Sequence, residues 1–101
     1  MRPIHLAHLD KARPVVVLTR QGVRSAMSRV AIAPITSAQK GIATEVLVGL
    51  RNGLEVESVI SCDNIITILA SELGRQIGWL LPDQERALSR AIGHAFDLEW
   101  Q

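Results

Sequence analysis

The sequence predicts a small α+β domain, in which a curled, barrel-like antiparallel sheet is followed by one C-terminal helix. In the first two thirds of the chain, short runs rich in β-branched residues alternate with turn signals, which is typical of strands. After Pro82 the spacing of the apolar residues changes to the helical period. The chain has 101 residues and a hydrophobic fraction of 48%, enough for one core but not for two. We therefore expect a single domain over residues 1–101.

The N-terminal half is expected to begin with a β-hairpin. The stretch "IHLAHL" (4–9) is interpreted as a short strand, and "PVVVLT" (14–19) as the next one. The residues "DKA" between them leave room for only a tight turn, so the two strands should pair. A polar loop, "RQGVRSAMS", then leads to a third strand in "RVAIAPITS", which we expect to end near Pro34.

The remaining elements follow from alternation and from helix signals. Alternating apolar residues predict a strand over 44–50, the turn signal "RNG" follows, and one or two further strands are expected within 57–68. A short helical turn is expected near "ASELGRQI", with Gly74 as its stop. The last helix is expected to start at Pro82, because proline is favoured in the first turn. Its apolar face is formed by Leu88, Ala91, Ile92 and Ala95.

The formal net charge of +1 is unevenly divided along the chain. Residues 1–51 contain eight Lys or Arg and two acids, a balance of +6, whereas residues 52–101 contain three Arg and eight acids, a balance of −5. This polarity favours a first half that faces a polyanion. The alternative is that folding mixes the two halves into an even surface, because halves of a sequence are not faces of a molecule.

The composition disfavours several classes of protein. No apolar stretch is long enough to span a bilayer and no signal-peptide pattern is present, so we expect a cytoplasmic protein without membrane contact. The single Cys62 is expected to be a buried structural thiol. His5 and His8 make a poor metal pair, because residues three apart on a strand point to opposite faces. No metal and no cofactor are expected.

Two polar residues stand out at the ends of the predicted strands. Arg13 precedes Pro14, and a residue before proline is held in extended geometry, so its guanidinium should project from a defined backbone. Thr36, followed by Ser37, ends the third strand. If these strands are neighbours, the guanidinium and the hydroxyl can meet at one rim and stabilise charge on a phosphodiester without a metal, and RNA supplies its own nucleophile, the 2′-hydroxyl. A solvated Arg at a strand end is the alternative.

The order of the sequence blocks resembles the MazF/PemK (Kid) toxin family over about residues 2–98. The blocks are "RPVVVLTR", "VAIAPITS", "GIATEV", "NGL…ESVISCDNI", "LGRQIGWL" and a short terminal helix. The resemblance implies a small SH3-like antiparallel β-barrel with a C-terminal α-helix, which forms a homodimer. It further implies a cytoplasmic, metal-independent endoribonuclease that cuts single-stranded RNA at short recognition sequences and is held inactive by a cognate antitoxin.

The family's motifs, carried over residue by residue, imply which side chains act. Arg13 in the "RP" block and Thr36 in the "PITS" block fall on the family's catalytic pair. Arg13 is then the phosphate-binding, general-acid-like group, and Thr36 stabilises the transition state. Auxiliary or RNA-binding positions are expected at Ser37, Lys11, His5, His8, Lys40 and Asn64.

Three departures from the family's pattern bear on the mechanism. Only "DKA" stands before Arg13, where members usually have a longer loop that takes part in RNA binding. The first strand has His5 and His8 where the family has an aromatic residue and an acid, so either imidazole is a candidate for the missing base. Ile66 stands where the family often has a basic residue.

Two other functions stay open at this point. The CcdB family shares the implied fold, acts by trapping DNA gyrase and characteristically ends in a Trp-bearing helix, with which Trp100 is compatible. An inactive family member that serves as a decoy for antitoxins is the second alternative, because the loop before Arg13 is short. The "RP" and "PITS" blocks favour the ribonuclease.

Overall fold

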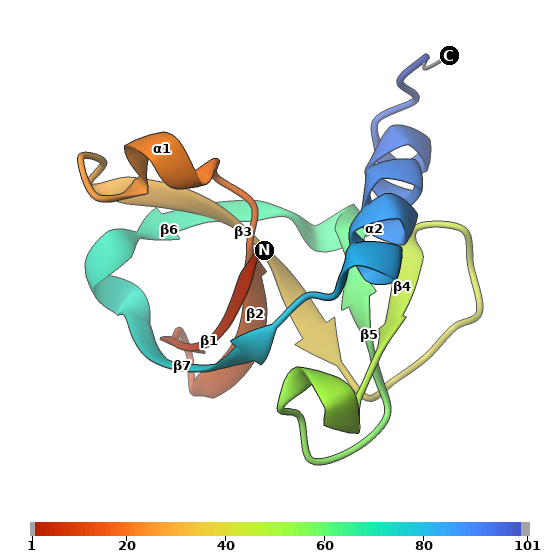
Figure 1. The fold of residues 1–101 in the computed structure, drawn as a ribbon, viewed down its shortest axis with the longest axis horizontal. Coiled ribbons are helices and arrows are strands. Elements are labelled where there is room, and N and C mark those ends of the chain that lie inside the picture. Colours follow the sequence, from red (N-terminus) through yellow and green to blue (C-terminus); the bar gives the residue numbers. More distant parts are fainter. Residues whose placement is uncertain (1, 100–101) are drawn as a thin grey trace.

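The computed structural model describes residues 2–99, which form a curled antiparallel sheet and a C-terminal helix (Figure 1). The chain begins with strands β1 (Pro3–His8) and β2 (Ala12–Val17), the short helix α1 (Gln21–Arg24) and strand β3 (Arg29–Thr36). Strands β4 (Glu45–Val48), β5 (Ser58–Ser61), β6 (Ile66–Leu69) and β7 (Leu73–Trp79) follow, before helix α2 (Pro82–Ala95). The 3₁₀ turns η1 (Leu50–Asn52), η2 (Cys62–Asn64) and η3 (Ala70–Glu72) connect them.

The sheet curls because β3 pairs with two different strands, one after the other, along the edge that faces away from β2. The strand order is β4-β5-β3-β2-β1-β7, and β6 also pairs with β3. Residues 29–32 of β3 pair with β6, whereas Ile35 and Thr36 at its end pair with β5. The predicted curled antiparallel sheet with a C-terminal helix is thus confirmed, and so is the predicted hairpin of β1 and β2.

Both faces of β2 are buried, as its uninterrupted apolar run predicts. Val16 belongs to the larger core cluster, which includes Leu88 of α2. Val15 and Val17 belong to a second cluster on the other face, together with Ile32 of β3. Because Val15, Val16 and Val17 are all 0% exposed, the buried end of β2 gives a rigid support to Arg13 and Pro14 in the first half of the strand.

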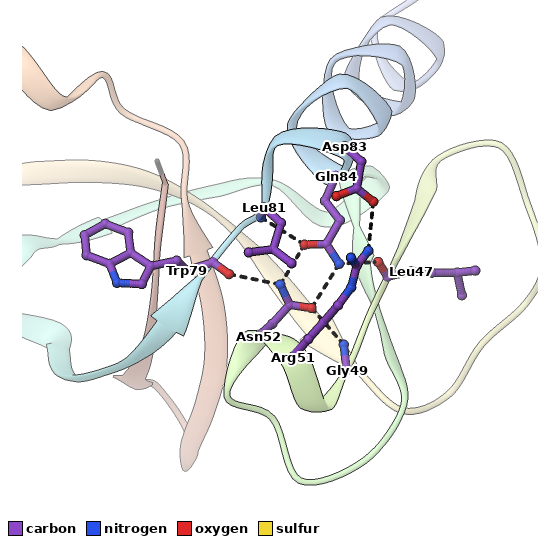
Figure 2. Close-up of polar contacts among 8 residues, drawn as sticks. All are labelled: Leu47, Gly49, Arg51, Asn52, Trp79, Leu81, Asp83 and Gln84. Atoms are coloured by element: carbon purple, nitrogen blue, oxygen red, sulfur yellow. Dashed lines mark hydrogen bonds and ion pairs between the residues drawn. The ribbon is translucent and has the colours of Figure 1, made fainter.

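Two buried amides fasten α2 to the sheet (Figure 2). Asn52 of η1 and Gln84 of α2 are 1% and 4% exposed, and each amide donates to the carbonyl of the other, at 2.6 and 3.0 Å. The two side chains also satisfy four backbone groups, namely the carbonyls of Leu47 and Trp79 and the N–H groups of Gly49 and Leu81. Because a buried amide without partners is costly, this pair fixes where α2, η1 and the end of β7 meet.

The turn after η1 packs its backbone directly against β7. Gly53 has a φ of 86°, and a Cβ added there would lie 1.9 Å from the carbonyl oxygen of Ile77. A Cβ on Gly78 would in turn lie 1.9 Å from the carbonyl oxygen of Asn52. Glycine is therefore required on both sides of this contact.

Three predictions about elements differ from the structure. The segment expected as a polar loop contains the short helix α1. The helical turn expected near residues 70–77 is limited to η3, and Gly74 lies inside strand β7 instead of ending a helix. Pairing of β7 with β1, a contact between distant parts of the chain, outweighs the local helical preference. The third strand continues past Pro34 to Thr36, because its last residues pair with β5 on the edge away from β2.

The expectation that Cys62 is a buried structural thiol agrees with the structure. Cys62 is buried, and burial together with the charge of Asp63 raises the pKa of its thiol to about 11, so that it is a structural residue. Within residues 2–99, no helix has the length and apolarity needed to cross a membrane.

The two halves of the chain are partly mixed by folding. Arg2 Nε lies 2.6 Å from Glu85 Oε1, and an Nη atom of Arg51 lies 2.8 Å from an Oδ atom of Asp83. Each of these ion pairs joins a cation of the first half to an acid of the second. Folding therefore mixes the charges of the two halves in part, as the alternative expects, and the polyanion-facing first half stays a prediction.

Candidate active site

Arg13 and Thr36 lie at adjoining ends of neighbouring strands. Strands β2 and β3 pair through Val15↔Pro34, Val16↔Ala33 and Val17↔Ile32, and continuing this register by two residues sets Arg13 opposite Thr36. Side chains alternate along a strand, so Arg13 shares the face of Val15, and Thr36 shares the face of Ile32. Both of these apolar residues belong to the same core cluster. The guanidinium and the hydroxyl therefore project from the same face at one end of the sheet.

Arg13 is held in place by an acid that the sequence analysis missed. Arg13 Nε and Nη2 donate to the two carboxylate oxygens of Asp10, at 3.0 and 3.1 Å. These hydrogen bonds lower the pKa of the Asp10 carboxyl to about 2 and raise that of Arg13. The only signal in the sequence was an acid three residues before Arg13, in a stretch interpreted as a simple turn. The pair leaves the guanidinium accessible, because its side chain is 44% exposed.

The Thr36 hydroxyl is oriented by the backbone that follows it. Its Oγ1 accepts a hydrogen bond from the N–H of Ala38 at 3.1 Å. A hydroxyl has one hydrogen to donate, and no acceptor for it is found among residues 2–99. Thr36 can therefore donate to an incoming oxygen. Ser37 follows it at an exposed position.

The structure brings only some of the expected auxiliary residues to this end of the sheet. Lys11 is exposed in the turn beside Asp10, and Lys40 lies in the loop after Thr36, where its backbone N–H donates to Glu45. Thr36 pairs with Val59 near the start of β5, whereas Asn64 follows the other end of that strand. The Asn64 amide donates to Ser61. Asn64 is thus separate from the Arg13 rim.

Both imidazoles of β1 reach the same glycine of β7. His5 Nδ1 lies 2.9 Å from the carbonyl oxygen of Gly74, and His8 Nε2 lies 2.6 Å from the position that a Cβ on Gly74 would take. The sequence predicts opposite faces for the two side chains, but the pairing of β1 with β7 shifts register on both sides of His5. Since a carbonyl only accepts, Nδ1 of His5 carries the hydrogen and its Nε2 is left as an acceptor.

A hollow of about 460 Å³ lies on the other side of Pro14. Leu6 and Ile77 form one wall, and residues 53–56 of the loop held by the Asn52 amide form the other. Arg75 is the cation in its lining. Glu55 is the acid in its lining, so the hollow presents one guanidinium and one carboxylate beside apolar side chains.

No cluster of three or more potential metal-ligating side chains (His, Cys, Asp, Glu) is found among residues 2–99. Trp100, on which the gyrase-poison alternative relied, lies outside the described residues.

The comparisons with known proteins place this chain in a family. A family model described as "PemK-like, MazF-like toxin of type II toxin-antitoxin system" matches residues 3–96. The chain belongs to this family. It is 60% identical over 100 residues to the endoribonuclease MazF3 of Mycobacterium tuberculosis, with 99% of this chain and 97% of that protein covered.

Solved structures of the family have the same fold. The M. tuberculosis toxin MazF-mt6 matches with a TM-score of 0.96 and 60% identity, over 98% of this chain and 100% of that one. A mycobacterial endoribonuclease in complex with its cognate antitoxin matches with a TM-score of 0.87 at 23% identity, over 98% and 95% of the two chains. The second likeness concerns the fold alone.

Proposed function

We propose that this toxin-family protein is an endoribonuclease that cuts single-stranded RNA at specific sequences, without a metal ion. The observation that carries the proposal is the placement of Arg13 and Thr36 at adjoining strand ends on one face, with Arg13 aligned by Asp10. The 60% identity to a protein named as an endoribonuclease supports it.

In the proposed reaction, the 2′-hydroxyl oxygen of the RNA attacks the adjacent phosphorus. The bond from phosphorus to O2′ forms as the bond to O5′ breaks. The 2′-hydroxyl proton passes to a base and O5′ takes up a proton from water, which leaves a 2′,3′-cyclic phosphate and a 5′-hydroxyl. Negative charge builds up on the phosphorane oxygens, and the guanidinium of Arg13 stabilises it through charge-assisted hydrogen bonds. Asp10 raises the pKa of Arg13, so that the guanidinium stays charged throughout. The Thr36 hydroxyl donates one more hydrogen bond.

His5 is our candidate for the base that takes the 2′-hydroxyl proton. In the β1–β2 register His5 pairs with Val15 and Ala7 pairs with Arg13, so His5 lies diagonally across from Arg13. Its Nε2 is the free acceptor. We expect His5→Gln to reduce the cleavage rate by roughly 10²-fold, the contribution of a general base. Added imidazole should restore part of that rate, and His8→Gln should cleave normally; equal rates for His5→Gln and wild type would remove His5 from the mechanism.

The proposed partners follow from the family. We propose that the protein acts as a homodimer in the cytoplasm, where its RNA substrate is found, and is inhibited by a cognate antitoxin. A mycobacterial endoribonuclease of the same fold is described in complex with its cognate antitoxin, which supports the antitoxin as a partner. Light scattering on the purified protein gives the oligomeric state.

The experiment that tests the proposed function is the cleavage of a long RNA of mixed sequence in EDTA. Discrete cuts with 5′-hydroxyl ends are expected for the wild type. Thr36→Val keeps the shape of the side chain but removes the hydroxyl, so its cuts should be strongly reduced. Thr67→Val, at an exposed position of β6, is the matched control. The absence of cleavage by folded wild type would contradict the proposal and favour an inactive or gyrase-directed protein.

A further inference from the structure

We propose that Arg2, Arg20 and Arg24 form a second phosphate-binding pocket, which holds the RNA backbone away from the cleaved bond. The inference rests on the proposed function, because it takes RNA as the ligand. It assigns a task to three arginines that the proposed cleavage step does not use.

The three arginines line one hollow of about 470 Å³. Arg2 comes from the residue before β1, and Arg20 and Arg24 come from the segment around α1. The remaining wall is formed by residues 80–82, where the chain enters α2. Figure 1 shows the start of β1 between α1 and the first turn of α2, which is how segments far apart in the sequence come to share this hollow.

The positive charge in this hollow is only partly neutralised. Glu85 is the one acid in its lining, and it accepts from Arg2 Nε at 2.6 Å. Three guanidiniums and one carboxylate leave a balance of +2. Arg24 donates through Nε to the carbonyl of Thr19, and the side chain of Arg20 has no hydrogen-bond or ion-pair partner among residues 2–99.

The neighbouring cations also act on one another. Burial, and then the charge of Arg2, lower the pKa of Arg24, which means that its charged form is less stable here than in water. An anion in the hollow removes this penalty. A phosphate suits the three side chains, because its oxygens accept from several guanidiniums at once.

The position of the pocket favours a long polyanion over an acidic segment of a protein. Arg13 precedes the buried part of β2, which from Arg13 to Val17 spans about 13 Å at about 3.3 Å per residue, and Arg20 lies three residues beyond the end of the strand. A single-stranded RNA held at Arg13 is long and charged along its whole length, so it can occupy both places at once. The +2 balance then increases the affinity for long RNA without touching the reacting atoms.

The test is the binding of a fully 2′-O-methylated RNA, which cannot be cleaved, measured by fluorescence anisotropy over a range of salt concentrations. The double variant Arg20→Gln/Arg24→Gln should bind a long RNA several-fold more weakly than wild type. Its plot of log affinity against log salt should be flatter by about 0.7 for each phosphate that the variant no longer neutralises. Arg90→Gln, an exposed arginine on α2, is the matched control and should behave as wild type.

Each outcome decides between the proposals. If wild type binds RNA and the double variant binds it with the same affinity and salt dependence, the pocket proposal is wrong and the proposed function stands. If the double variant loses affinity for a purified antitoxin but not for RNA, the pocket serves an acidic protein partner, and the inference is overturned. If folded wild type binds no RNA at all, both proposals fail. Circular dichroism on each variant establishes that it is folded.

Discussion

At the scale of single residues, the proposed chemistry depends on how Arg13 is held. Pro14 restricts its backbone, the buried valines of β2 fix the strand, and Asp10 accepts hydrogen bonds from Nε and Nη2 along one edge of the guanidinium. Arg13 and Thr36 could be chosen as candidate site residues from the sequence, because the proline after Arg13 and the strand end at Thr36 are both recognisable there. Asp10 was missed because its role depends on the direction of a side chain across a turn, which spacing alone does not give.

Replacing Asp10 by Asn should slow cleavage without unfolding the protein. Asn cannot form the charged bidentate pair, so the guanidinium loses its fixed orientation, and we expect a loss of roughly tenfold to hundredfold in kcat. An exposed ion pair adds little to stability, so the unfolding midpoint should stay the same. Asp83→Asn breaks the comparably exposed pair with Arg51 and is the control. A wild-type kcat for Asp10→Asn would show that the pair has no part in catalysis.

The Asp10–Arg13 pair should persist far into the acid range. The pKa of Asp10 is lowered from 3.8 to about 2, so the interaction is fully present above the unfolded value and is lost as the pH falls towards about 2. Carboxyl ¹³C NMR should place the midpoint of Asp10 near this lower value. In Arg13→Ala the midpoint should return towards 3.8, the ordinary value. A midpoint that does not move on this substitution would contradict the pairing.

At the scale of elements, the strands that alternate strongly were predictable, and β7 was not. The segment "LGRQIGW" contains two glycines and no clear alternation, yet it is a strand because β1 offers it a partner. The cluster of Arg2, Arg20 and Arg24 was equally hidden, since it forms only when the hairpin, α1 and the start of α2 meet. Local sequence patterns predict individual strands and helices, whereas strand β7 and the arginine cluster depend on contacts between distant segments.

The amide pair between η1 and α2 should be a main determinant of stability. Asn52→Leu removes one partner from each end of the buried Gln84 amide, and it takes the Asn52 partner away from the carbonyl of Trp79 and the N–H of Gly49. We expect the free energy of unfolding to fall by about 3 kcal/mol, the cost of leaving such groups unsatisfied. Asn64→Leu, whose amide donates only to Ser61 at an exposed position, should change it by less than about 0.5 kcal/mol. Urea unfolding measures both; equal stabilities of the two variants would show that the pair contributes nothing.

At the scale of the whole molecule, two groups of cations lie at opposite ends of β2. Two ion pairs between the halves of the chain neutralise part of the basic excess of residues 1–51. The excess that is left includes Arg13 at one end of the strand and the Arg20 pocket at the other. In our proposal the Arg13 end of β2 cleaves the RNA and the Arg20 pocket at the other end holds it. This explains why positive charge is kept at both ends.

The most direct test of this account is the single-turnover cleavage rate of Arg13→Lys, compared with wild type and with Arg29→Lys, which alters an exposed arginine at the start of β3. Lysine keeps the charge but lacks the planar fork that binds Asp10 and phosphate together. We expect a loss of roughly 10²-fold or more for Arg13→Lys, the size of losing one donor to the transition state, and no loss for Arg29→Lys. Cleavage by Arg13→Lys at the wild-type rate, at the same sites in the RNA, would contradict the central role of the Arg13 guanidinium.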